Sequence, residues 1–235
     1  VCQIASLSGR LPDSRLTADR LETWQAEALD IAARIGDAGG SQLRKEPVSL
    51  TLRGVVLAAE LPWVEGEDRL LLWRPSKQKS KDLIRLWLYH LCAQLHKGAD
   101  VITQGIFLDD EVKFGSVENP DHQLNVIIES YLRGVCEPLA LHAELGLTLA
   151  KSQYSTPKNK PVTLKSDPES ERRKQWDKLW LRGDYTQDYA FSMNAYVRWF
   201  WPEAPELEEA WASLAAIYVP EIECLIGYQG AASDE

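Results

Sequence analysis

Several features that define common protein classes are missing from this 235-residue sequence. No run of apolar residues approaches the ~18 that cross a bilayer, and the first residues lack the basic-then-apolar layout of a secretory leader. The four cysteines stand singly, without a CxxC pair, which argues against a disulfide framework or a zinc knuckle. We therefore expect a soluble, cytoplasmic protein with reduced thiols and no contact with a membrane.

Methionine is also scarce, because the only one is Met193 and the sequence begins with Val1. We therefore expect the chain to be a fragment of a longer protein. Its composition, with 45% hydrophobic and 26% charged residues, is that of an ordinary globular domain that buries a core. Disordered and collagen-like classes are excluded.

Short motifs of known chemistry are absent as well. The sequence contains no GxSxG elbow, no GxxxxGK[ST] phosphate loop and no GxGxxG fingerprint. Its four histidines and four cysteines do not have the spacing of a zinc site. We therefore predict no catalytic residues, no metal and no cofactor.

What is present is an uneven distribution of charge. The net charge is −9, yet residues 151–183 hold nine lysines and arginines against four acids. An acidic surface repels a phosphate backbone, so any nucleic-acid contact is confined to this basic stretch. The alternative interpretation is a solvated loop that its lysines keep soluble. The candidate DNA contacts are Lys151, Lys158, Lys160, Arg172, Arg173 and Lys174.

Hydrophobic periodicity predicts the order of the elements. Apolar residues at helical spacing indicate a helix over 17–35, capped by Thr17, and further helices over 80–97 and 120–141. A strand hairpin is expected between 48–64 and 69–76, and two short strands within 101–116. A basic loop around 151–170 precedes helices over 169–182, 187–200 and 206–218 in a helical C-terminal part, 169–228. This order predicts one α/β (α+β) domain over 1–235, with a single mixed sheet flanked by helices.

The hairpin and the helix that follows it, residues 50–97, have the layout of many metal-dependent nucleases. In such enzymes one strand supplies an aspartate and the next supplies Asp/Glu-x-Lys; the carboxylates hold Mg²⁺, which activates a water. Here the first strand reads RGVVLAA from Arg53, and the second reads LLWRPS from Leu71. Because hydrophobic groups stand where the acids would be, we expect the domain not to cleave DNA.

This pattern resembles the nuclease domain of RecB-type helicase-nucleases. There, a Gly-x-x-Asp strand precedes a strand ending Leu-Leu-Asp-Tyr-Lys-Ser and a helix that carries Gln-x-x-x-Tyr. The resemblance implies a restriction-endonuclease-like fold whose active site is degenerate. In this sequence the corresponding positions are Gly54, Leu57, Trp73, Arg74, Pro75, Arg85 and Tyr89.

The particular version Leu-Leu-x-Trp-Arg-Pro-Ser is similar to the C-terminal region of exodeoxyribonuclease V gamma subunits, the RecC family. The segments Arg-Arg-Lys-Gln-Trp at 172–176 and Leu-Arg-Gly-Asp-Tyr at 181–185 add to this likeness. The resemblance implies a non-catalytic domain in a helicase-nuclease that processes double-strand breaks for recombination. Its implied partners are RecB-like and RecD-like subunits, and the domain would support docking of the RecD-like one. It would meet DNA through the assembled complex.

Two other hypotheses remain open. One is a working nuclease whose metal ligands are displaced to Glu60, Glu65 or Asp68 in the hairpin. The other is a protein-interaction module unrelated to DNA. The nine tryptophans have two interpretations of their own. They pack in the core, because aromatic residues dominate cores, or those exposed on the last helices are hot spots for a partner.

Overall fold

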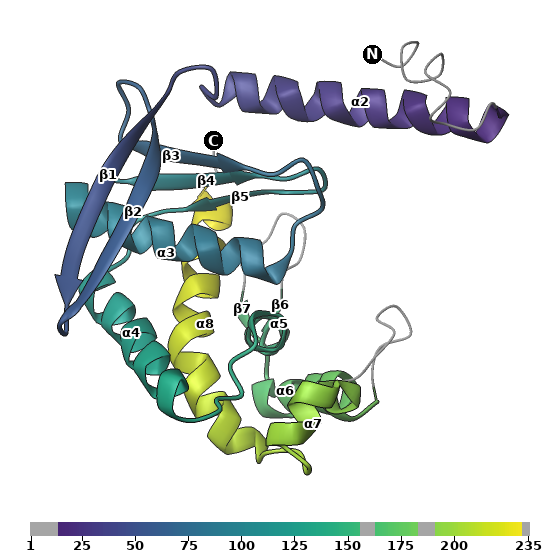
Figure 1. The fold of residues 1–235 in the computed structure, drawn as a ribbon, viewed down its shortest axis with the longest axis vertical. Helices are drawn as coiled ribbons and strands as arrows, with labels where there is room; N and C mark the ends of the chain where they lie inside the picture. The colour runs from purple at the N-terminus through teal and green to yellow at the C-terminus, as the bar shows by residue number, and fades with distance from the viewer. Residues whose placement is uncertain (1–13, 156–162, 183–190, 232–235) are drawn as a thin grey trace.

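The structure is a computed structural model that describes residues 14–155, 163–182 and 191–231 (Figure 1). It begins with helix α2 (Arg15–Asp37), which extends away from the rest of the molecule. The helix is capped by Ser14, whose hydroxyl accepts a hydrogen bond from the Thr17 backbone N–H at 3.2 Å. The predicted helix is thus confirmed, but its cap is Ser14 and not Thr17.

A mixed five-stranded sheet forms the centre of the fold. Strands β3 and β4 are parallel, and the other neighbours are antiparallel. The predicted α/β class, with a mixed sheet flanked by helices, is therefore confirmed. The spatial order follows the sequence: β1 (Leu43–Leu52), β2 (Val55–Val64), β3 (Arg69–Trp73), β4 (Ile102–Ile106) and β5 (Glu111–Phe114).

The hairpin lies at a different place from the predicted one. Strands β1 and β2 pair along ten residues each, and Arg53 and Gly54 form the turn between them. Both turn residues have positive φ, 49° and 78°, as a two-residue type I′ turn requires. By contrast, β2 and β3 share a single registered pair, Trp63 with Leu70. The single strand expected over 48–64 is therefore two strands that meet at this turn.

Helices cover both faces of the sheet. Helix α3 (Ser80–Lys97) connects the parallel strands β3 and β4 and packs closely on one face (Figure 1). Gly105 of β4 permits this approach, because a Cβ there would lie 2.4 Å from the Leu86 side chain. The opposite face is covered by the end of α2, where Ile31 packs in a small cluster with Val64 and Leu71.

The second half of the chain adds helices on the α3 side. Helix α4 ends at Cys136, earlier than predicted, and α8 continues through Pro220, well beyond the predicted end at 218. The predicted helix over 169–182 is α6 followed by a π-helical turn. Of the segment predicted over 187–200, residues 187–190 lie outside the described part. The bounds are α4 (Pro120–Cys136), α5 (Ala143–Ser152), α6 (Pro168–Trp176), the π-helical turn (Asp177–Arg182), a 3-10 turn (Phe191–Met193), α7 (Ala195–Phe200) and α8 (Leu207–Ala231).

The stretch predicted as a basic loop, 151–170, contains regular structure in its described residues. It includes the end of α5, the start of α6 and a short antiparallel pair between β6 (Tyr154–Ser155) and β7 (Thr163–Leu164). Lys165 donates its backbone N–H to the Gln153 carbonyl at 2.8 Å, which extends this ladder. Residues 156–162, between the two strands, lie outside the described part.

One hydrophobic cluster joins the two halves of the chain. It includes buried side chains from Val48 in β1 to Leu225 in α8. Helix α8 packs against α5, and the Tyr218 ring lies directly over Gly146. Within the described residues, no helix combines the length and the apolar character that crossing a bilayer requires.

Candidate functional site

The end of β3 is where the nuclease pattern places its acidic and basic residues. Trp73 is the last residue of the strand, and its side chain is 44% exposed. Pro75 is also exposed, and Arg74 between them is half-buried. An indole and a pyrrolidine ring offer no oxygen donor to a divalent cation, which prefers carboxylates and carbonyls.

Leu57 does not join these residues, because it lies on the other face of the sheet. Trp63 and Leu70 are paired, and both belong to the core beneath α3. Leu57 is six residues from Trp63, so strand alternation directs it to that same face, where it packs against the core. Trp73 is three residues from Leu70 and therefore points to the opposite face. The structure thus separates two of the positions that the resemblance groups together.

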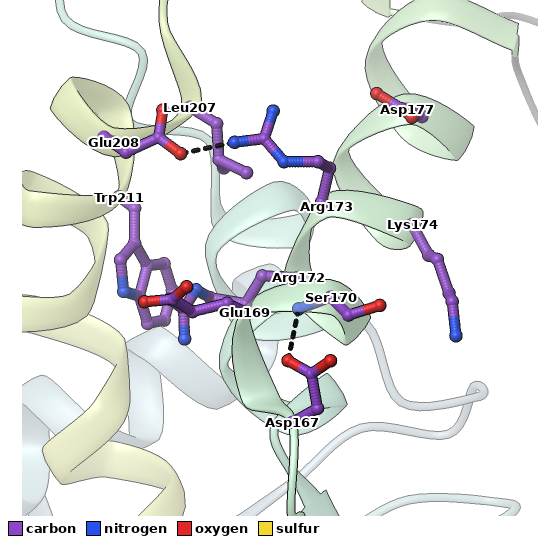
Figure 2. A pocket seen from close by; sticks show the side chains of 10 residues that line it. All are labelled: Asp167, Glu169, Ser170, Arg172, Arg173, Lys174, Asp177, Leu207, Glu208 and Trp211. Atoms are coloured by element: carbon purple, nitrogen blue, oxygen red, sulfur yellow. Dashed lines mark hydrogen bonds and ion pairs between the residues drawn. The ribbon is translucent and has the colours of Figure 1, made fainter.

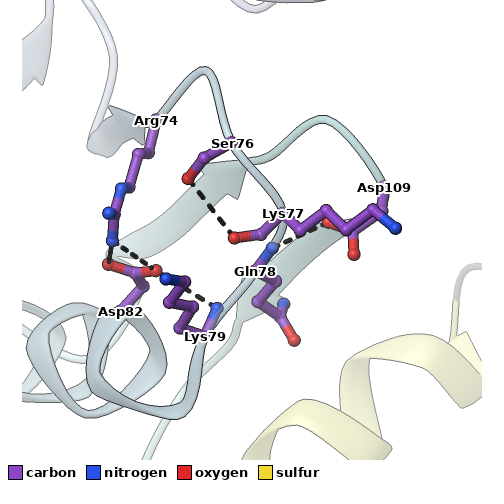
Figure 3. A network of polar contacts seen from close by, with 7 residues as sticks. All are labelled: Arg74, Ser76, Lys77, Gln78, Lys79, Asp82 and Asp109. Atoms are coloured by element: carbon purple, nitrogen blue, oxygen red, sulfur yellow. Dashed lines mark hydrogen bonds and ion pairs between the residues drawn. The ribbon is translucent and has the colours of Figure 1, made fainter. Parts of the chain in front are cut away.

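One carboxylate beside the end of β3 is Asp82, in the first turn of α3, where it meets Arg74 (Figure 3). Arg74 Nη1 donates to both of its oxygens, at 2.8 and 3.0 Å, and the Lys79 backbone N–H donates to Oδ2 at 3.1 Å. The carboxylate is largely buried and fully engaged in fixing the start of the helix. Asp82 was not identified from the sequence, although an acid in the first turn of a predicted helix is a common signal.

Two further acids hold the loop between β3 and α3. Asp109, in the turn between β4 and β5, accepts the Gln78 backbone N–H at 2.7 Å (Figure 3). The neighbouring Asp110 accepts the Gln78 side-chain N–H at 3.4 Å and the Glu111 backbone N–H at 2.9 Å. These carboxylates therefore stabilise loops that border the end of β3. Among the described residues, no cluster of three or more His, Cys, Asp or Glu side chains could hold a metal ion.

The remaining positions of the pattern are also dispersed. Gly54 lies in the β1–β2 turn, where its positive φ is required. Arg85 and Tyr89 lie one turn apart on α3, and the guanidinium is 5.3 Å from the centre of the Tyr89 ring. Arg85 also donates to the Tyr89 hydroxyl at 3.3 Å. The two side chains therefore contact each other on the surface of α3.

The alternative ligand set is not assembled either. Glu60 is in the middle of β2 and forms an ion pair with Lys45 of β1 at 3.8 Å. Glu65 and Asp68 are in the turn that precedes β3. The five residues of β3 separate that turn from Trp73, a distance of roughly 16 Å at the usual rise of a strand.

The cations of α6 line a pocket of about 640 Å³ between α6 and the start of α8 (Figure 2). Arg172 lies over the Trp211 ring, 5.0 Å from its centre, and donates to the Gln153 side chain at 2.8 Å. Arg173 forms an ion pair with Glu208. Lys174 pairs with Glu171 at 2.7 Å, and each partner shifts the pKa of the other so that both stay charged.

These internal ion pairs reduce the positive potential that the sequence predicts at this surface. Lys151, at the end of α5, is exposed. Lys158 and Lys160 lie outside the described residues. Of the tryptophans, Trp63, Trp87, Trp176 and Trp180 are buried, which confirms core packing as one of their roles, whereas Trp24, Trp73 and Trp199 are exposed.

The fold and the loops at the end of β3 define a mixed α/β domain consistent with a nuclease-like α+β architecture. A sequence model of the RecC C-terminal domain family matches residues 1–154, so the chain belongs to that family. Over 113 residues the chain is 34% identical to the RecBCD enzyme subunit RecC of Escherichia coli (strain K12). That match covers 46% of this chain and spans about a tenth of the length of the relative. The resemblance predicted from the sequence is confirmed.

Proposed function

We propose that this chain is a non-catalytic domain of an exodeoxyribonuclease V gamma subunit, in a helicase-nuclease that repairs double-strand breaks by recombination. The observation that carries the proposal is the type of residue at the end of β3. There Trp73 stands in place of the aspartate of the nuclease pattern, and Pro75 stands in place of its lysine. Of the carboxylates that border this end, Asp82 accepts from Arg74 with both oxygens, and Asp109 accepts the Gln78 backbone N–H. Without a bound cation, phosphodiester cleavage loses several kcal/mol of transition-state stabilisation.

We further propose that the domain works by holding other subunits, a RecB-like and a RecD-like one, in place beside the DNA. The relative is described as a subunit of the RecBCD enzyme, which supports a role inside an assembly. In this proposal DNA is engaged through the assembled complex. The pairing of Arg173 with Glu208 and of Lys174 with Glu171 supports that division, because these cations already have acidic partners.

The whole chain acts as a single nuclease-like domain in this proposal. The core that runs from Val48 to Leu225 supports it, because side chains of both halves pack in one cluster. A DNA-processing subunit of this kind would work in the cytoplasm, where bacterial DNA is found.

The test is a cleavage assay on linear duplex DNA with Mg²⁺ or Mn²⁺, using the 235-residue chain and the full complex that contains it. We expect no metal-dependent cleavage by the chain. The complexes with Asp82→Asn and with Glu60→Ala should degrade DNA as the unmodified complex does. Cleavage by the chain that disappears in Asp82→Asn, or in alanine variants of Glu60, Glu65 or Asp68, would establish the displaced-ligand nuclease instead.

A further inference from the structure

Helix α7 is short but firmly held. The Asn194 side chain caps it by accepting the backbone N–H groups of Tyr196 and Val197, at 2.9 and 3.4 Å. At its other end the Trp201 N–H donates to the Val197 carbonyl at 2.8 Å. The helix therefore keeps a defined orientation on the domain surface (Figure 1).

The inner side of α7 rests on a cluster of aromatic rings. Trp201 meets Trp180 edge to face, with ring centres 6.1 Å apart. Trp180 in turn stacks on Trp176 at 5.0 Å and contacts Phe191 at 6.1 Å. Val197, one turn before Trp201, packs against the same core. The core side of the helix is thus already occupied.

The outer side of α7 is also aromatic. Tyr196, Trp199 and Phe200 have the i, i+3, i+4 spacing of a single helix face, and their side chains are 82%, 82% and 55% exposed. Met193, just before the helix, is 60% exposed. A surface helix of a monomeric domain needs only one apolar face, so this second face, which we call the α7 aromatic face, marks an interaction site.

The charges around this face indicate the kind of partner. The stretch that contains this face and the start of α8, residues 191–209, has four acids and one base, Arg198. Glu203, Glu206 and Glu209 are exposed and form no salt bridge within the described residues. An acidic border repels the phosphates of nucleic acid, and it attracts a protein surface that carries lysine or arginine.

We propose that the α7 aromatic face is the anchor by which this domain docks onto another protein subunit of its complex, one with an apolar socket bordered by basic residues. The inference rests on the proposed function and specifies the docking surface. A fully exposed aromatic side chain presents about 200 Å², so at their exposed fractions the three side chains together present roughly 450 Å². A standard interface uses about 800 Å² per partner, so the face supplies its centre and not its whole extent.

The central experiment compares assembly of the full complex with Trp199→Ala and with the double variant Tyr196→Ala/Trp199→Ala. Tyr131→Ala is the matched control, because it removes an exposed aromatic side chain, 64% exposed, from α4. We expect the α7 variants to weaken binding of the remaining subunits about 10- to 100-fold, the range of a hot spot. The Tyr131→Ala control should bind the remaining subunits within about twofold of the wild type. Circular dichroism should show that all variants are folded.

Charge reversal tests the acidic border separately from the aromatic face. Glu206→Lys together with Glu209→Lys should slow association and weaken its salt dependence, since opposite charges steer proteins together. Binding of the double aromatic variant within twofold of the wild type would overturn the inference. If that complex assembles and still shows no cleavage attributable to this domain, the proposed function stands and only the docking surface fails.

Two other occupants would also overturn the inference. If the face stacks single-stranded bases, Trp199→Ala would weaken binding of an oligothymidylate and leave assembly unchanged. If it binds a second copy of the chain, light scattering would show a concentration-dependent dimer that Trp199→Ala abolishes.

Discussion

A buried carboxyl group in α8 provides a quantitative prediction about stability. Glu221 is 0% exposed, and neither of its carboxylate oxygens has a hydrogen-bond partner. Burial raises its pKa to about 8, although the positive charge of Lys151 acts in the opposite direction. Glu221 is therefore protonated in the folded state at neutral pH, whereas it ionises near its ordinary value of 4.5 in the unfolded chain.

The sign of the effect follows from this difference. Below pH 4.5 both states are protonated and the fold keeps its full stability. As pH rises through 4.5 and up to about 8, the unfolded state ionises first, so the free energy of unfolding falls. Each unit of pKa difference is worth about 1.4 kcal/mol, so the loss between pH 5 and pH 9 is roughly 2 to 5 kcal/mol.

Replacing Glu221 by glutamine removes the ionisation and should flatten this dependence. Urea unfolding at pH 5, 7 and 9 measures it, with Glu209→Gln, an exposed position on the same helix, as the control. We expect the stability of Glu221→Gln relative to wild type to increase steadily with pH, and Glu209→Gln to follow the wild type. Parallel curves for wild type and Glu221→Gln would refute a raised pKa at this position.

Three further predictions concern the core and the loop. Gly146→Ala should lower the melting temperature, because its Cβ would lie 2.1 Å from the Tyr218 ring, whereas Gly134→Ala, with its nearest neighbour at 3.6 Å, should not. Burial lowers the pKa of His90 to about 4, so stability should fall as pH drops from 6.5 to 4, less steeply in His90→Gln. Arg74→Ala should cost about 1 kcal/mol by urea unfolding, since the pair is only partly buried.

The order of elements could be predicted from the sequence because most segments have a clear hydrophobic period. The hairpin turn was misplaced because the alternation of residues 48–53 was joined to the apolar run that follows Gly54 as one strand. Gly54 was the available signal, and the structure gives both Arg53 and Gly54 a positive φ. The helix predicted over 206–218 continues through Pro220, where packing of α8 on α5 and β5 outweighs the lost hydrogen bond.

The departures from the nuclease pattern could be read directly, because they are differences of residue type at Trp73 and Pro75. The placement of Leu57 and Trp73 on opposite faces of the sheet could not be read from the sequence, since it depends on the register between β2 and β3. The ion pair between Arg74 and Asp82 could not be predicted either, because it depends on where α3 begins relative to the end of β3. The pairing of Arg173 with Glu208 was missed for the same reason, since the two residues are 35 apart in the sequence.

Manganese binding offers the most direct test that this scaffold has lost the chemistry of a nuclease. Electron paramagnetic resonance of Mn²⁺ titrated into the chain counts bound ions without relying on activity. We predict no stoichiometric site, and the same free-ion signal for wild type and Asp82→Asn. One tightly held Mn²⁺ per chain, lost in Asp82→Asn, would contradict the account.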